Sequence, residues 1–190
     1  MLEDSKVKNG FLYRFTAINI LAVMILGATF HQGWVTQIYN ADVTHITTVI
    51  GVVFLLGLLV SIVKAVQINR LWNQLELDAI STQPWICRPE AVGLRISSSI
   101  QIIHHIAASL LLLGIIGTLV GIILALKSTE AFSTSSQANL VVAIVMLFQG
   151  VYVKFFCSLV GIVGHMWLMN NYSMLVSMGR RLLARMYEHA

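Results

Sequence analysis

Charged residues are scarce in this sequence. Asp, Glu, Lys and Arg make up 11% of the 190 residues, while 57% are hydrophobic, and the mean hydropathy is +0.82. Soluble globular domains carry roughly 25% charged residues. The shortage of charge excludes a soluble domain of ordinary composition and indicates an integral membrane protein.

Cysteine and proline are also rare, with two residues of each. Cys87 falls in a predicted loop and Cys157 in an apolar stretch, at no spacing typical of metal ligands or of a disulfide pair. The cysteines therefore suggest neither a zinc site nor an oxidised scaffold. No inverted repeat or broken helix is visible, which makes a small solute carrier a less favoured class.

Carboxylates are missing from the long apolar stretches of the chain. Ion pathways across a membrane usually depend on ionisable side chains within it. Without a carboxylate there, the chain cannot easily bind and release a cation alone. The eight acidic residues, all outside those stretches, are Glu3, Asp4, Asp42, Glu76, Asp78, Glu90, Glu130 and Glu188.

What the chain does have is four long apolar stretches. Their lengths are near the ~20 residues that a helix needs to cross the hydrocarbon of a bilayer. We read the first as a retained helix, because the following "GATFHQGW" offers no signal-peptide cleavage site. The sequence thus predicts an all-α membrane protein with a single membrane domain, 1–190. The predicted spans are residues 11–35, 46–66, 100–126 and 140–170.

Basic residues set the predicted topology, because Lys and Arg concentrate on the cytoplasmic side of a membrane. They cluster before the first span, between the second and third, and after the fourth, whereas the other two connections hold only Lys127. Both termini are therefore expected in the cytoplasm, and the positive charge marks topology rather than nucleic-acid binding. The cytoplasmic groups are Lys6, Lys8 and Arg14; Lys64, Arg70, Arg88 and Arg95; and Arg180, Arg181 and Arg185.

Amphipathic segments extend the predicted spans into the cytoplasm. Residues 67–80 and 175–186 place apolar side chains at helical spacing. Pro89 followed by Glu90 suits the first turn of the next helix, where proline is tolerated and a carboxylate meets the positive end of the helix dipole. The apolar positions are Ile68, Leu71, Trp72, Leu75 and Ile80, and Leu175, Met178, Leu182, Leu183 and Met186.

Two of the spans carry a stripe of small and polar residues. In the third span, helical periodicity aligns Thr118 with Gly114, Gly121 and, further inward, His104. The spans run in opposite directions, so Thr118 and Ser158 are predicted at similar depth. Such stripes usually serve close helix packing, but packing alone does not call for hydroxyls and ionisable groups on both helices. The fourth-span stripe is Gly150, Lys154, Ser158, Gly161 and His165.

These motifs resemble those of a known family. "LGIIGTLVGI" (113–122) is similar to the signature of the pore-lining helix in the MotA/TolQ/ExbB proton-channel family, approximately L-G-L-x-G-T-V-x-G-I, and "CSLVGIVGHMWLMNNY" (157–172) to its following helix. The resemblance covers about 75 residues, 98–172. Val153 stands where some relatives carry an acid, and the long cytoplasmic domain of flagellar stators has no counterpart.

The resemblance implies a function. A member of this family is the pore-forming subunit of an ion-driven rotary motor, driven by protons or sodium in the bacterial inner membrane. Its subunits form a homo-oligomeric ring, a pentamer, around a single-span MotB/TolR/ExbD-like partner whose helix brings in an aspartate. By matching position, Thr118 and Ser158 would line the cavity that faces this aspartate, together with Gly114, Gly121 and Gly161. Neither enzymatic activity nor a cofactor is expected.

Each of three ionisable residues has two alternative roles. Lys154 either pairs with a partner's carboxylate or snorkels to the outer interface. His104 is either a proton relay or an interfacial residue, and His165 either a relay or a hydrogen-bonded packing residue. For the whole chain, the alternative from another class is a non-conducting four-helix membrane scaffold in which the glycine stripes only pack protomers together.

Overall fold

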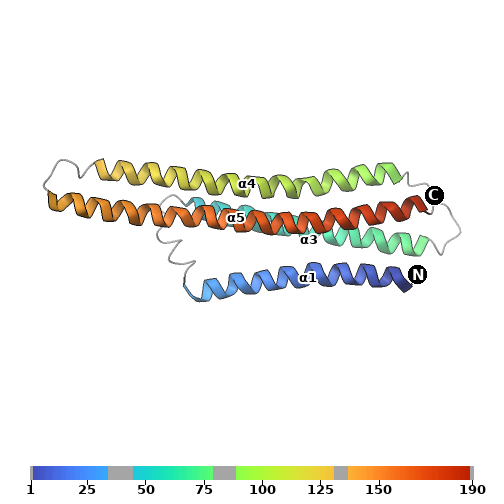
Figure 1. Ribbon diagram of the computed structural model, residues 1–190. Helices are drawn as coiled ribbons and strands as arrows, with labels where there is room; N and C mark the ends of the chain where they lie inside the picture. The colour runs from blue at the N-terminus through green and yellow to red at the C-terminus, as the bar shows by residue number, and fades with distance from the viewer. Residues whose placement is uncertain (1, 34–44, 79–88, 131–136, 189–190) are drawn as a thin grey trace. The chain divides into compact units, whose positions relative to one another are not determined.

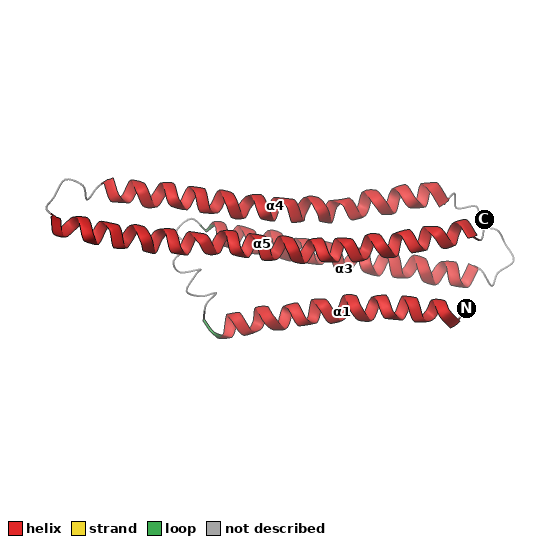
Figure 2. Ribbon diagram, in the orientation of Figure 1, coloured by secondary structure: helices red, strands yellow, loops and turns green. Residues whose placement is uncertain are grey.

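Four long helices make up the part of the chain that the computed structural model describes, which is residues 2–33, 45–78, 89–130 and 137–188. Figure 1 labels them α1, α3, α4 and α5. No strand occurs in these ranges (Figure 2), so the predicted all-helical class is confirmed there. The helices are α1 Leu2–His31, α3 Ile46–Asp78, α4 Pro89–Glu130 and α5 Gln137–Glu188.

Three of these helices contain segments long and apolar enough to cross a membrane: Tyr13–His31, Ile46–Gln74 and Gly93–Lys127. They overlap the first three predicted spans and indicate a multi-pass membrane protein. The fourth predicted span, residues 140–170, falls inside α5 and stays a prediction. The predicted end of the first span at Val35 lies outside the described residues, as does Cys87.

The helices continue beyond the predicted spans, as the amphipathic pattern indicates. α3 runs on to Asp78, α4 begins at Pro89, and α5 reaches Glu188. Apolar side chains of the extensions are buried, which supplies the contacts that hold these segments helical. Those with the lowest exposure are Ile68, Trp72, Leu175, Met178 and Leu182, at 8% or less.

The chain divides into two compact units, and the division falls part-way along each helix. Unit 1 consists of Met1–Leu26, Leu56–Ile106 and Trp167–Ala190. Unit 2 consists of Gly27–Leu55 and Ala107–Met166. Thr118 and Ser158 therefore belong to unit 2, whereas the basic ends of the helices belong to unit 1.

Glycines allow the helices of each unit to approach closely. In unit 1, a Cβ on Gly57 of α3 would overlap Leu168 of α5 and lie 3.0 Å from Ile106 Cγ2 of α4. In unit 2, a Cβ on Gly164 of α5 would lie 3.2 Å from Phe54 Cδ2 of α3. Each glycine thus leaves room for a large side chain of the neighbouring helix, which lets the helices pack closely.

Candidate functional site

The two hydroxyls singled out in the sequence meet in unit 2. Thr118 Oγ1 of α4 and Ser158 Oγ of α5 are 2.6 Å apart, within hydrogen-bonding distance. Both side chains are half-buried. The two residues predicted at similar depth are thus in contact, while their place in an ion pathway stays a prediction.

Both hydroxyls also lie within hydrogen-bonding distance of backbone carbonyls. Thr118 Oγ1 lies 3.1 Å from the carbonyl of Gly114 and 2.9 Å from that of Lys154. Ser158 Oγ lies 3.1 Å from the same Gly114 carbonyl. Two hydroxyls hold only two protons for these contacts. The protons can consequently be arranged in more than one way without moving a heavy atom.

The carbonyls do not depend on the hydroxyls for their hydrogen bonding. In an α-helix each carbonyl accepts from the amide four residues later. The Gly114 carbonyl thus accepts from the Thr118 amide, and the Lys154 carbonyl from the Ser158 amide. A hydroxyl can turn its proton towards another acceptor without leaving either carbonyl unsatisfied.

Two glycines bring the backbones close enough for these contacts. A Cβ on Gly161 would lie 2.8 Å from the Leu110 carbonyl oxygen and 3.0 Å from the Gly114 Cα. One on Gly114 would lie 3.2 Å from the Cys157 carbonyl oxygen. The obstacles are backbone atoms, which cannot rotate away as a side chain can. Glycine at these two positions therefore sets the distance between α4 and α5.

The third predicted glycine accommodates a lysine. A Cβ on Gly121 of α4 would overlap the Cγ, Cδ and Cε atoms of Lys154 on α5. Lys154 is only 6% exposed. Its aliphatic stem thus fills the space that the missing side chain of Gly121 leaves.

His165 makes a hydrogen bond across the same two helices. Its Nδ1 lies 2.8 Å from the Ala107 carbonyl oxygen. A carbonyl can only accept, so Nδ1 carries the proton, and Nε2 of the neutral ring is then an acceptor. The bond matches the packing alternative for His165, and the acceptor nitrogen keeps the relay alternative open.

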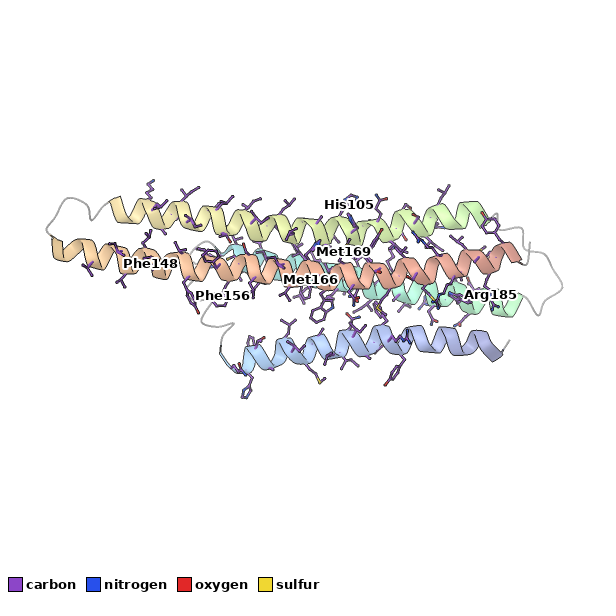
Figure 3. The ribbon with its side chains drawn as sticks, viewed as in Figure 1. His105, Phe148, Phe156, Met166, Met169 and Arg185 are labelled. Carbon is purple, nitrogen blue, oxygen red and sulfur yellow. The ribbon has the colours of Figure 1, made fainter. Side chains whose placement is uncertain are left out.

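His104 belongs to unit 1, whereas the hydroxyl pair belongs to unit 2. It is half-buried, and its ring centroid is 5.4 Å from that of Tyr172 on α5. The exposed His105, labelled on α4 in Figure 3, follows it in the chain. The two rings are edge-on, with their centroids 5.9 Å apart. The structure therefore gives His104 an aromatic neighbourhood and leaves its predicted relay role a prediction.

A buried amide cluster in unit 1 is the main polar feature that the sequence analysis missed. Asn19 of α1 and Asn171 of α5 exchange two hydrogen bonds of 3.1 and 3.2 Å. Trp167 donates its indole proton to Asn19 Oδ1 at 3.1 Å, and Asn171 is fully buried. The signal in the sequence was an asparagine within the apolar part of the first span.

Cys157 also has a contact that its sequence position did not reveal. Its side chain is fully buried, and its Sγ lies 3.0 Å from Thr47 Oγ1 of α3. A Cβ on Gly117 would lie 2.9 Å from Ile46 Cγ2. Through these two contacts α3 closes one side of the α4–α5 pair in unit 2.

The described residues contain no group of three or more His, Cys, Asp or Glu side chains that could hold a metal ion. Comparison with family models, with curated proteins and with solved structures finds no match.

Chemically, the site can exchange hydrogen bonds but cannot titrate near neutral pH by itself. Threonine and serine hydroxyls donate one proton and accept at two lone pairs. A carboxylate brought to them would receive charge-assisted hydrogen bonds, which are about twice as strong as neutral ones. Lys154, one helical turn away on α5, would add a positive charge nearby.

Proposed function

We propose that this protein is the pore-forming subunit of an ion-driven rotary membrane motor of the MotA/TolQ/ExbB type. The observation that carries the proposal is the Thr118–Ser158 hydroxyl pair, whose oxygens are 2.6 Å apart across α4 and α5, one helical turn from the buried Lys154. The motifs around both residues, 113–122 and 157–172, resemble those of the same family.

The chain would require a second protein to move ions, because its own acidic residues lie outside the apolar segments. That partner is a single-span subunit of the MotB/TolR/ExbD kind, which supplies an intramembrane aspartate. The hydroxyls of Thr118 and Ser158 would hold this carboxylate in its charged form. Lys154 would contribute attraction from one turn away, which distinguishes this chain from relatives with an acid beside that position.

Ion entry would then drive motion. A proton or sodium ion that neutralises the aspartate weakens its hydrogen bonds to the hydroxyl pair, so the carboxyl detaches. The carboxyl then releases the ion on the opposite side of the membrane, so the aspartate is ionised again. The next subunit's hydroxyl pair takes up this ionised aspartate, and the ring turns around the partner by one step. Each charge that crosses releases ~2.3 kcal/mol per 100 mV, enough to separate hydrogen bonds of this strength.

The assembly that this mechanism requires is a homo-oligomeric ring, a pentamer, in the bacterial inner membrane. α5 would cross the membrane as the fourth span, over residues 140–170. The exposed apolar side chains of α5, such as Phe148 at 69% and Met166 at 66% (Figure 3), would face lipid or a neighbouring subunit. Membrane lipid is therefore a further partner.

Isosteric removal of the hydroxyls tests the proposal. Thr118→Val keeps the side-chain shape and removes only its hydrogen bonding, and Ser158→Ala removes the second hydroxyl. We expect the complex to assemble while ion-driven activity falls, and the double variant to fall further than either single one. Ion flux into vesicles containing the chain and its partner measures the effect.

A matched control is Thr48→Val, which removes an exposed hydroxyl from α3 and should leave flux unchanged. A double variant that assembles normally and retains full ion-driven work would contradict the assignment of these two residues. A neighbouring gene for a short protein with one apolar span and an aspartate would support the partner.

The second candidate is a non-conducting four-helix scaffold. The close backbone approach at Gly114 and Gly161 favours it, because such packing occurs without any ion pathway. A scaffold would tolerate Thr118→Val plus Ser158→Ala with little effect, since packing is nearly preserved, and it would have no aspartate-bearing partner.

A further inference from the structure

Contacts in unit 1 fix how α4 lies along α5. The two helices run antiparallel, so residue numbers fall along one as they rise along the other. In this register Arg95 of α4 comes level with Arg181 of α5. The contacts that set it pair Gly93 with Leu183, Gly179 with Ile96 and Ile100, and His104 with Tyr172.

A contact in unit 1 also fixes the register of α3 against α5. Gly57 meets Leu168 of α5 and Ile106 of α4, and α3 runs in the same direction as α5. Counting equal numbers of residues from this contact along both helices places Arg70 of α3 level with Arg181.

Hydrogen bonds fix the register of α1, which runs antiparallel to α5. Asn19 hydrogen-bonds to Asn171 and to Trp167. Counting inward from this contact brings the backbone of Lys6 and Lys8 to the level of the arginines on the other helices.

All four helices thus place basic residues at one level of unit 1, which we call the basic tier. The guanidinium-bearing side chains of the tier are exposed on three different helices. Its members are Lys6, Lys8, Arg70, Arg95, Arg180 and Arg181.

What borders the tier differs on its two sides. Towards the middle of the helices, within about two helical turns, exposed aliphatic side chains, including Val66 at 45%, Ile102 at 49% and Val63 at 46%, stand among the exposed Tyr13 and Arg14 and further exposed polar residues. Towards the helix ends, roughly 5–12 Å further at 1.5 Å per residue, come six acidic positions: Glu3, Asp4, Glu76, Asp78, Glu90 and Glu188.

We propose that the basic tier binds the phosphate groups of anionic phospholipids at one leaflet of the membrane. Guanidinium groups match phosphate geometry with paired hydrogen bonds. Lipid tails would cover the aliphatic surface on one side, while the acidic positions extend past the headgroups into water. An acidic protein partner fits less well, because it would meet those acidic positions beside the tier.

The proposal does not depend on the ion-motor function and is tested with the full chain in neutral detergent. Native mass spectrometry counts bound phosphatidylglycerol and phosphatidylcholine during titration with each lipid. We expect the wild-type protein to prefer phosphatidylglycerol. Basic side chains near an anionic surface each strengthen binding roughly fivefold, so Arg70→Gln plus Arg95→Gln plus Arg181→Gln should weaken phosphatidylglycerol binding at least tenfold.

Three controls make the result specific. The corresponding Arg→Lys triple variant keeps the charge and should bind within about threefold of wild type. Lys127→Gln, at the opposite end of α4, should have no effect. If the triple variant does not fold, Arg95→Gln alone replaces it, and we expect this variant to bind phosphatidylglycerol roughly fivefold more weakly than wild type.

Several outcomes would overturn the proposal. Equal binding of both lipids by the wild-type chain would do so, as would a triple Gln variant that keeps the wild-type preference. Competition by inorganic phosphate at the same phosphate concentration would show a site for free phosphate instead. A triple variant with changed oligomeric state and unchanged lipid binding would assign the tier to contacts between protein chains.

Discussion

Lys154 illustrates how a charged residue can be placed inside an apolar helix. If α5 crosses the membrane as proposed, this lysine lies near the middle of the span, where it costs about 2.5–3.5 kcal/mol on insertion scales. Here the aliphatic stem is buried where Gly121 provides space, so the methylene groups contribute packing while the ammonium carries the cost. The stem and the charge therefore have separable effects.

Substitutions at Lys154 should separate these two contributions. Lys154→Met keeps an unbranched chain against Gly121, so we expect a stability within about 1 kcal/mol of wild type. If the charge pairs with a partner's carboxylate, Lys154→Glu should abolish ion-driven activity or assembly with the partner, and Lys154→Arg should be far milder. Ion flux and co-purification of the partner measure this.

Equal tolerance of Lys154→Glu and Lys154→Arg would favour the snorkelling alternative. Loss of folding in Lys154→Met would show that the charge is needed within the chain itself.

At the scale of the elements, α4 and α5 are held at a short distance by two glycines. The obstacles to a larger residue at Gly161 are the Leu110 carbonyl and the Gly114 Cα. By contrast, nothing lies within 4 Å of a Cβ on Gly51 of α3, also in unit 2. The chain thus offers a matched pair of helical glycines, one constrained and one open.

Gly161→Ala should lower the free energy of unfolding by about 1–3 kcal/mol, the usual range for overpacking. Gly51→Ala should leave it unchanged or raise it by up to about 1 kcal/mol, because alanine favours the helix. Thermal unfolding in detergent, followed by circular dichroism, compares the two. Equal midpoints for both variants would mean that α4 and α5 separate without loss, contrary to the close contact described.

The amide cluster holds α1 against α5. In membrane proteins such hydrogen bonds contribute about 0.6 kcal/mol on average, with a maximum near 1.7. Asn171 is buried, whereas its neighbour Asn170 is exposed, so the two allow a direct comparison. The cluster is the principal polar link that the described residues show between these helices.

A double-mutant cycle measures this link. Asn19→Leu and Asn171→Leu should each lower the free energy of unfolding. The loss in the double variant should be smaller than the sum of the two single losses by at least 0.5 kcal/mol. Asn170→Leu should change stability by no more than about 0.5 kcal/mol. Additive losses would show that the two amides do not act as a pair.

For the whole molecule, the open question is how many chains assemble. Polar stripes on two helices would be shielded from lipid in a ring, and the exposed aliphatic side chains of α4 and α5 provide area for contact between chains. We expect native mass measurement of the detergent-extracted protein to show a homo-oligomer, with five chains as the main species. A preparation containing only monomers would contradict the ring and with it the rotary proposal.

The sequence by itself determined the secondary structure and the approximate ends of the helices. Hydrophobic runs and amphipathic periodicity depend only on local spacing, so α3 begins at Ile46, where the second span was predicted to begin, and α4 begins at Pro89, as predicted for its first turn. Helical geometry also sufficed to put Thr118 and Ser158 at similar depth, because both helices rise by the same distance per residue.

Only the tertiary structure decided which side chains meet. Rotation and distance between helices depend on packing along their whole length, and no local pattern encodes them. The exchange of hydrogen bonds between Asn19 and Asn171, the lysine stem against Gly121 and the level basic tier all follow from that packing. The similar depth of Thr118 and Ser158 could be predicted because it depends on helical rise alone, whereas their contact and the amide cluster depend on helix rotation.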